Sequence, residues 1–244
     1  LLLFVVYFQW INVDEFILGV IGVYILRMII MKLYAFSVKF PVIKFYRIEN
    51  VSSILKYSSL IIIAGSIATV ILDIDSFMLG LYIPIEKVAY YGVAIYIATV
   101  IVVPSRSMQQ ILQPLTAQYL NDNNKVALKD LYVRSSQTLF VIGGFIFLII
   151  VLNINQLYEL IPEEFSGGLI VVFLVGVAKL YDCLMGCNNV VLFNSDYYRV
   201  VLLFGVLLTI LTVFLNMLFI PMFGINGSAF ATFLAISIYN TIKI

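Results

Sequence analysis

A small number of charged side chains lie inside long apolar stretches of this sequence, and these residues are the ones placed to do chemistry. Asp73 and Asp75 stand near the end of one stretch, where a carboxylate could hold a proton, a cation or a sugar hydroxyl. Two residues of an α-helix turn through about 200°, so at most one of these side chains can face a central cavity, and we favour Asp75. The alternative is that both carboxylates lie at a solvated helix end.

A second charged pair, Lys179 and Asp182, is spaced three residues apart, so both side chains project from the same face of a helix. One interpretation is a pair that lines a cavity, where the Lys179 ammonium could meet a phosphate. The other is an ion pair within one helix that satisfies itself, with the long Lys179 side chain reaching back to the nearer membrane interface.

Two arginines complete the candidates. Arg106 follows Pro104 at the inner end of its apolar stretch, and a guanidinium binds phosphate through two parallel hydrogen bonds, although it could equally be an interfacial anchor. Arg27 lies about two turns from the end of its own stretch, deeper than an anchor requires. The candidate substrate-binding residues are therefore Arg27, Arg106, Lys179 and Asp182, and the candidate ion-coupling residues are Asp73 and Asp75.

The sequence lacks the residues that several classes of chemistry require. The chain has no histidine, and its two cysteines, Cys183 and Cys187, lie within an apolar run where thiols pack rather than bind metal. Motifs for nucleophilic, zinc or nucleotide chemistry are not found. We therefore expect no enzyme activity, no catalytic residue, no cofactor and no metal centre, and the net charge of +1 favours no nucleic-acid partner.

The elements that must position these residues are transmembrane helices. The sequence is 63% hydrophobic and 11% charged, whereas a soluble domain is about 25% charged. Its apolar runs are unbroken, unlike the alternating strands of membrane barrels. We predict an all-α, polytopic transmembrane bundle of seven or eight spans. The predicted spans are the tail Leu1–Phe8, then Phe16–Tyr34, Tyr57–Leu79, Val88–Pro104, Gln137–Leu152, Gly167–Gly186, Val200–Phe219 and Gly227–Ile242.

The charges between these spans predict their orientation. Apart from Arg27 and Lys87, every Lys and Arg falls at one set of ends, and acidic residues dominate the opposite set. Basic loops remain on the cytoplasmic side. The most basic loop, Ala35–Lys56, is therefore predicted to be cytoplasmic. Small residues within spans, such as Gly143, Gly176 and Gly227, predict close helix packing, and the apolar runs at both ends suggest a fragment of a longer protein.

Several short motifs in the second half carry a resemblance to a known family. They are Asp75–Gly80, Tyr91–Ala94, Pro104, Leu112–Ala117, Asn121–Asn124, Leu128–Tyr132 and Phe223–Thr232. In order and spacing they resemble the Wzx-type polysaccharide or O-antigen flippases of the multidrug/oligosaccharidyl-lipid/polysaccharide exporter superfamily, over about residues 55–244.

The resemblance implies a fold of two six-helix bundles around a cavity that opens alternately to each side. On this basis residues 1–35 end the first bundle, residues 36–56 form the basic cytoplasmic loop between bundles, and residues 57–244 form most of the second bundle, incomplete at its C-terminus. The family further implies a monomer in the bacterial cytoplasmic membrane.

The implied function is to flip a lipid-linked oligosaccharide, held on undecaprenyl pyrophosphate, from the cytoplasmic to the outer leaflet for lipopolysaccharide or related polysaccharide synthesis. Arg27, Arg106 and Lys179 could attract the diphosphate, and Asp75 could couple transport to protons or sodium. Of these, only Asp75 lies in a matched motif. The alternatives are a multidrug or cation antiporter, a lipid II flippase, a membrane-embedded polymerase, although its usual large outer loop is missing, and a purely structural membrane scaffold.

Overall fold

A computed structural model describes residues 13–38, 51–159, 161, 163–195 and 197–243. Within these ranges every regular element is a helix, as the unbroken apolar runs predicted. The chain separates into two compact units, residues 1–54 and 55–244, which are described one at a time.

The described part of the first unit is helix α2 (Val13–Val38), with Asp14 and Glu15 in its first turn, where carboxylates favour the helix dipole. Its residues 14–38 are long and apolar enough to cross a bilayer, which confirms the span predicted over Phe16–Tyr34. Residues 1–12 and 39–50 lie outside the described residues, and so do most of the predicted basic loop and the first predicted partial span.

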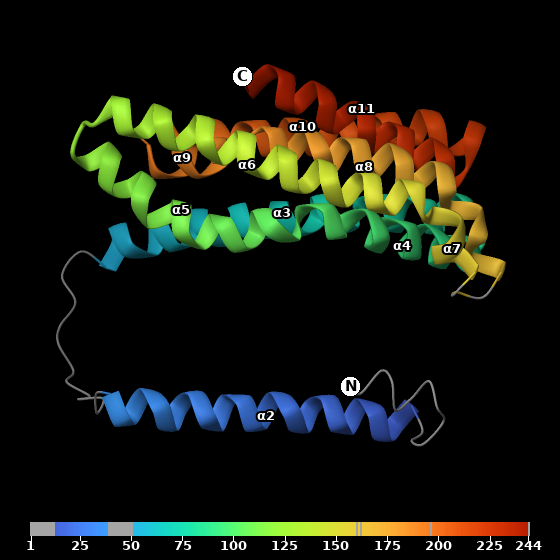
Figure 1. Cartoon of the computed structure of the whole chain (residues 1–244), viewed down its shortest axis with the longest axis horizontal. Helices are drawn as coiled ribbons and strands as arrows, with labels where there is room; N and C mark the ends of the chain where they lie inside the picture. The colour runs from blue at the N-terminus through green and yellow to red at the C-terminus, as the bar shows by residue number, and fades with distance from the viewer. Residues whose placement is uncertain (1–12, 39–50, 160, 162, 196, 244) are drawn as a thin grey trace. The chain divides into compact units, whose positions relative to one another are not determined.

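The second unit is a bundle of antiparallel helices joined by short turns (Figure 1). Its elements are α3 (Val51–Tyr82, beginning at the end of the first unit), α4 (Ile85–Thr99), the 3-10 turn η1 (Val100–Val102), α5 (Val103–Asn121), α6 (Lys125–Leu152), α7 (Ile154–Glu159), η2 (Glu163–Gly168), α8 (Leu169–Leu184), α9 (Asn188–Asn194), α10 (Tyr198–Phe223) and α11 (Ile225–Lys243). Residues 36–38 and 51–56, predicted as loop, are therefore helical.

The span predicted to stop at Pro104 continues. Helices α4 and α5 and the turn between them form one apolar segment, Ile85–Asn121, of 37 residues. Pro104 lies in the first turn of α5, where its missing N–H removes no helical hydrogen bond, and η1 absorbs the change in backbone geometry. The sequence-based reading of Pro104 as the end of the helix is therefore wrong.

Four helical segments in the described residues are long and apolar enough to span a membrane, or five if the bent pair α8–α9 counts as one. They are α2, the α4–α5 segment, α6 and α10. We predicted seven or eight spans. Helix α11 is not among the four, since it carries polar residues such as Asn226, Ser228 and Asn240 within its 19 residues. The protein is a multi-pass membrane protein.

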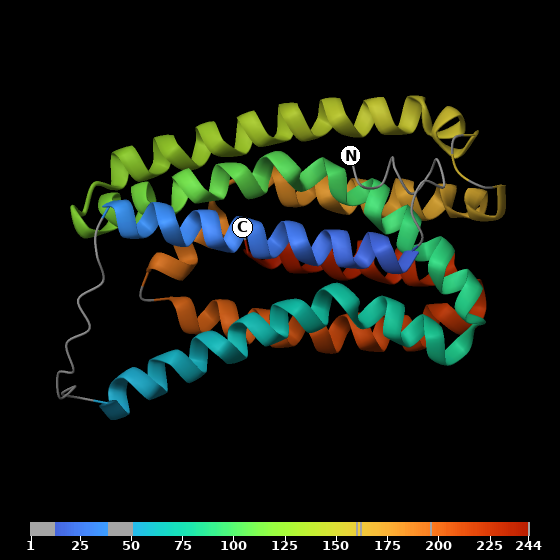
Figure 2. The same ribbon diagram turned by 90° about the horizontal axis from the view of Figure 1, so that it is seen from below.

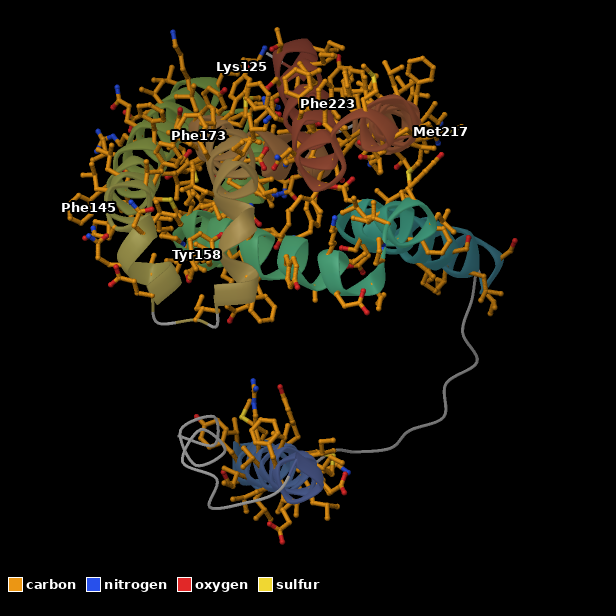
Figure 3. All side chains as sticks on the ribbon, turned by 90° about the vertical axis from the view of Figure 1, so that its right-hand side faces the viewer. Lys125, Phe145, Tyr158, Phe173, Met217 and Phe223 are labelled. Atoms are coloured by element: carbon orange, nitrogen blue, oxygen red, sulfur yellow. The ribbon has the colours of Figure 1, made fainter. Side chains whose placement is uncertain are left out.

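The second unit has an apolar exterior. Large side chains such as Phe145 and Met217 are 63% and 55% exposed, and Figure 3 shows both pointing away from the bundle. The interior instead holds small residues and buried polar ones, including Asn216 and Ser228. A soluble protein seldom exposes so large an apolar surface, whereas lipid tails cover it without cost.

Helix α8 packs against α4, α6 and α11 and thereby occupies the centre of the bundle. Glycines allow these close contacts, as predicted: a Cβ at Gly143 would lie 3.0 Å from Cys183 Sγ, and one at Gly176 would lie 2.9 Å from the Phe147 ring. The same principle holds between α10 and α11, where a Cβ at Gly227 would lie 2.0 Å from the Phe219 carbonyl oxygen.

The span predicted over Gly167–Gly186 corresponds to α8, and at its end the chain bends by 53° into α9 (Figure 2). Gly186 has a φ of +55° there, and a side chain would also collide with the backbone of Ser136. Serines of α6 satisfy the freed backbone groups: Ser135 Oγ accepts from the Cys187 N–H at 3.2 Å, and the Ser136 hydroxyl donates to the Leu184 carbonyl.

Candidate ion and substrate sites

The Asp75 side chain, on the long helix α3, is the centre of a buried polar cluster. It is only 6% exposed and lies about 10 Å from the outer end of α3, given the rise of a helix. Asn216 Nδ2 donates to Asp75 Oδ1 at 2.6 Å. The Tyr91 hydroxyl donates to Oδ2 at 3.1 Å, and the Thr232 hydroxyl donates to the same oxygen.

Four helices bring this cluster together, with Asp75 on α3, Tyr91 on α4, Asn216 on α10 and Thr232 on α11. The α10–α11 turn is tight, so the partners from these two helices meet at one level of the bundle. Ser228 of α11 adds a weaker hydrogen bond, donated to the Tyr91 hydroxyl oxygen at 3.4 Å. Each helix therefore supplies a polar group to one carboxyl, which we call the Asp75 cluster.

The Asp75 cluster has the composition of a site for a proton or a hard cation. Its atoms are one carboxylate, three hydroxyls and a carboxamide, and oxygen is the ligand that hard cations prefer. The Asn216 side-chain oxygen is buried and makes no hydrogen bond to a described residue. Hydroxyls can rotate and present lone pairs, so a cation would find oxygen ligands around Asp75 without a rearrangement of the backbone.

In the part of the chain that the structure describes, no group of three His, Cys, Asp or Glu side chains lies close enough to hold a metal. Asp73, the other predicted ion-coupling residue, is exposed on the same helix. The two carboxyls therefore occupy different environments, and Asp75 alone contacts the polar groups of neighbouring helices.

Lys179 and Asp182 lie on the same face of α8, with Lys179 Nζ 3.8 Å from Asp182 Oδ2. Lys179 is about 15 Å from the start of α8, half the thickness of a hydrocarbon core. Asp182 Oδ1 also accepts from Asn240 Nδ2 of α11 at 2.8 Å. The intrahelical ion pair considered from the sequence is present, and the hydrogen bond from Asn240 connects it to helix α11.

The Lys179 side chain is 17% exposed, so the ammonium is mostly enclosed by protein. The second unit thus holds two enclosed ionisable side chains, Asp75 on α3 and Lys179 on α8.

Arg106 is exposed on α5 and forms no ion pair with any residue that the structure describes. It is 21 residues after Ile85, or about 32 Å along the helix, which is close to the thickness of the hydrocarbon core. The helix continues past Arg106 to Asn121, and the place of Arg106 at the inner interface stays a prediction. Arg27 is exposed on α2, in the first unit.

Sequence reasoning missed the partners of Asp75. Tyr91 and Thr232 were noted within the family motifs but were given no role, and Asn216 was not singled out. The signal for Asn216 was present, because it is an asparagine inside the apolar run Val200–Phe219 and is completely buried. A polar side chain at such a position usually bonds to another helix.

Apolar membrane-spanning helices around buried ionisable residues define the class as a multi-pass membrane protein with a polar interior. Residues 61–164 match the family model MatE, a range that runs from α3 to η2 and includes Asp75, Tyr91 and Arg106. This match covers 104 of the 244 residues and supports a membrane transporter. No curated protein and no solved structure matches the chain.

Proposed function

We propose that this protein flips a lipid-linked oligosaccharide, carried on undecaprenyl pyrophosphate, across the bacterial cytoplasmic membrane. In this proposal transport is coupled to the entry of a proton or sodium ion at Asp75, and the protein acts as a transporter and not as an enzyme. The resemblance of residues 55–244 to Wzx-type flippases supplies the cargo, and the MatE match supports the wider class.

The observation that carries the proposal is the presence of Asp75 and Lys179, two ionisable residues, inside one bundle at membrane depth. A charged residue costs at least about 2.5 kcal/mol at the centre of a membrane helix, so its retention favours a functional role. The Asp75 cluster suits the coupling ion because its neutral groups are oxygen ligands.

The cations suit the diphosphate of the cargo. Arg106 lies exposed near the inner interface, where a lipid-linked substrate enters, and Lys179 lies deeper in the bundle. If the substrate diphosphate replaces Asp182 as the partner of Lys179, the cargo is drawn from the interface toward the middle of the membrane. Asp182 then keeps its hydrogen bond from Asn240, so the carboxylate is not left without a partner.

The test is complementation in a bacterial strain that lacks its own O-antigen flippase. We expect the full-length protein to restore surface polysaccharide. Lys179→Gln should reduce the polymer at least tenfold at equal membrane levels, because the buried cation at mid-depth is lost. The control variant Lys87→Gln removes an exposed lysine from the first turn of α4 and should leave the amount of surface polysaccharide unchanged.

The main alternative is a multidrug or cation antiporter of the same superfamily. If the strain gained resistance to cationic dyes and made no surface polymer, the protein would be an antiporter and the flippase proposal would be wrong. Export of peptidoglycan precursor in the same strain background would point to a lipid II flippase.

A further inference from the structure

We propose that the hollow between α6 and α9 binds the headgroup of an anionic phospholipid, and we take phosphatidylglycerol as the lipid that tests this proposal. This inference concerns a different surface from the Asp75 cluster and does not depend on the transported cargo. The hollow has a volume of about 260 Å³ and is lined by Lys125, Leu128, Lys129, Tyr132, Asn188, Val191 and Leu192.

The charges of the hollow select an anion. Lys125, Lys129 and Tyr132 recur on one face of α6, so two ammonium groups and a phenolic hydroxyl line the same opening. The neighbouring Asp130 does not neutralise them, because it is paired with Arg134 at 2.8 Å. Asp122, in the turn before α6, does not line the hollow.

The remaining lining selects a lipid over a soluble anion. Leu128, Val191 and Leu192 form an apolar wall beside the two lysines. Beneath this wall lies the small core of Leu112, Cys187 and Val190, which keeps α9 against α5. A phosphodiester on the lysines would therefore leave the glycerol and the first acyl methylenes against leucine and valine.

The hollow lies at the depth of lipid headgroups. Helix α6 has 28 residues and extends over about 42 Å, whereas the hydrocarbon core is about 30 Å thick. If its outer end at Leu152 marks one edge of that core, Lys129 lies about 5 Å beyond the other edge, among the headgroups. Loop charge predicts this to be the cytoplasmic side, where anionic lipids attract clustered lysines.

The experiment is native mass spectrometry of the full chain in detergent, titrated with phosphatidylglycerol or phosphatidylcholine. We expect retained phosphatidylglycerol, little phosphatidylcholine, and an affinity at least about tenfold weaker in Lys125→Gln/Lys129→Gln. The Lys125→Arg/Lys129→Arg variant should bind as wild type does. Lys32→Gln/Lys87→Gln removes the same amount of charge from exposed positions elsewhere and should also bind normally.

Three results would overturn the proposal: equal binding of phosphatidylcholine, unchanged phosphatidylglycerol binding in Lys125→Gln/Lys129→Gln, or displacement of the lipid by equimolar glycerol phosphate or inorganic phosphate. The last result would assign the hollow to a soluble anion. If the double variant does not fold, Leu192→Trp keeps both lysines and fills the hollow, and it should weaken phosphatidylglycerol binding by a similar factor.

Discussion

At the scale of single residues, the surroundings of the Asp75 carboxyl bear on both fold stability and ion coupling. Three side chains from three other helices donate to its two oxygens. Such an arrangement stabilises the fold and also places oxygen ligands around one negative charge. Fold stability and ion coupling are separable by replacing the carboxyl with an amide of the same shape.

We expect Asp75→Asn to abolish cation-dependent transport and to keep the protein folded. An asparagine side chain fills the same volume and still accepts hydrogen bonds from Tyr91 or Thr232, but it cannot carry the negative charge that binds a cation. The measurement is transport in proteoliposomes with imposed sodium or proton gradients, and the loss should exceed tenfold.

The matched control is Asp73→Asn, which removes an exposed carboxyl from the same helix and should transport normally. If both variants transport equally well under either gradient, Asp75 is a structural residue and the coupling site lies elsewhere.

At the scale of elements, the close approach between helices depends on a few glycines. Helices α10 and α11 meet at Gly227, and α6 and α8 meet at Gly143, where there is no room for a methyl group without a shift. These contacts position the Asp75 cluster, because α10 and α11 carry Asn216 and Thr232.

Gly227→Ala should therefore destabilise the second unit. Its Cβ would lie 2.0 Å from a backbone oxygen, which cannot rotate away as a side chain could. We expect the free energy of unfolding to fall by about 1–3 kcal/mol. The buried thiols of Cys183 and Cys187, 1% and 0% exposed, provide the readout, because a thiol-reactive dye labels them only when the protein unfolds on heating.

Gly92→Ala is the control for this substitution. Gly92 lies in α4 with no atom within 4 Å of an added Cβ, so alanine should leave the unfolding temperature unchanged or raise it slightly through its higher helix propensity. An equal decrease for both variants would show that the α10–α11 contact is not the cause.

At the scale of the whole molecule, the ends of the bundle differ in charge. In the second unit, the turn between α5 and α6 is followed by Lys125 and Lys129, whereas Glu86 and Glu159 lie at the opposite end. The positive-inside rule then gives one orientation for all helices of the unit, with the α5–α6 turn in the cytoplasm.

Cysteine labelling tests this orientation. In intact cells a membrane-impermeant maleimide should label Glu86→Cys, whereas Asn123→Cys, in the α5–α6 turn, should react only after the membrane is permeabilised. The native cysteines are buried and should contribute no background while the protein is folded. The reverse labelling pattern would invert the predicted topology and move the proposed lipid site to the outer leaflet.

The sequence alone determined the class of protein and much of its local structure. Composition and unbroken apolar runs sufficed for a helical membrane bundle, because a bilayer constrains a helix to about 20 apolar residues whatever its neighbours. The period of the helix likewise showed that Asp73 and Asp75 face different directions. At Pro104 local reasoning failed, since a 3-10 turn lets the helix continue where a sequence pattern suggests its end.

Only the tertiary structure decided which polar groups meet. Asn216 and Thr232 are 141 and 157 residues from Asp75 in sequence, and no local pattern states which faces of α3, α10 and α11 are opposed. That choice depends on close packing at small residues and on the requirement that buried polar groups find partners. The hollow beside α6 has the same origin, because it forms only where the break after α8 turns α9 toward the lysines.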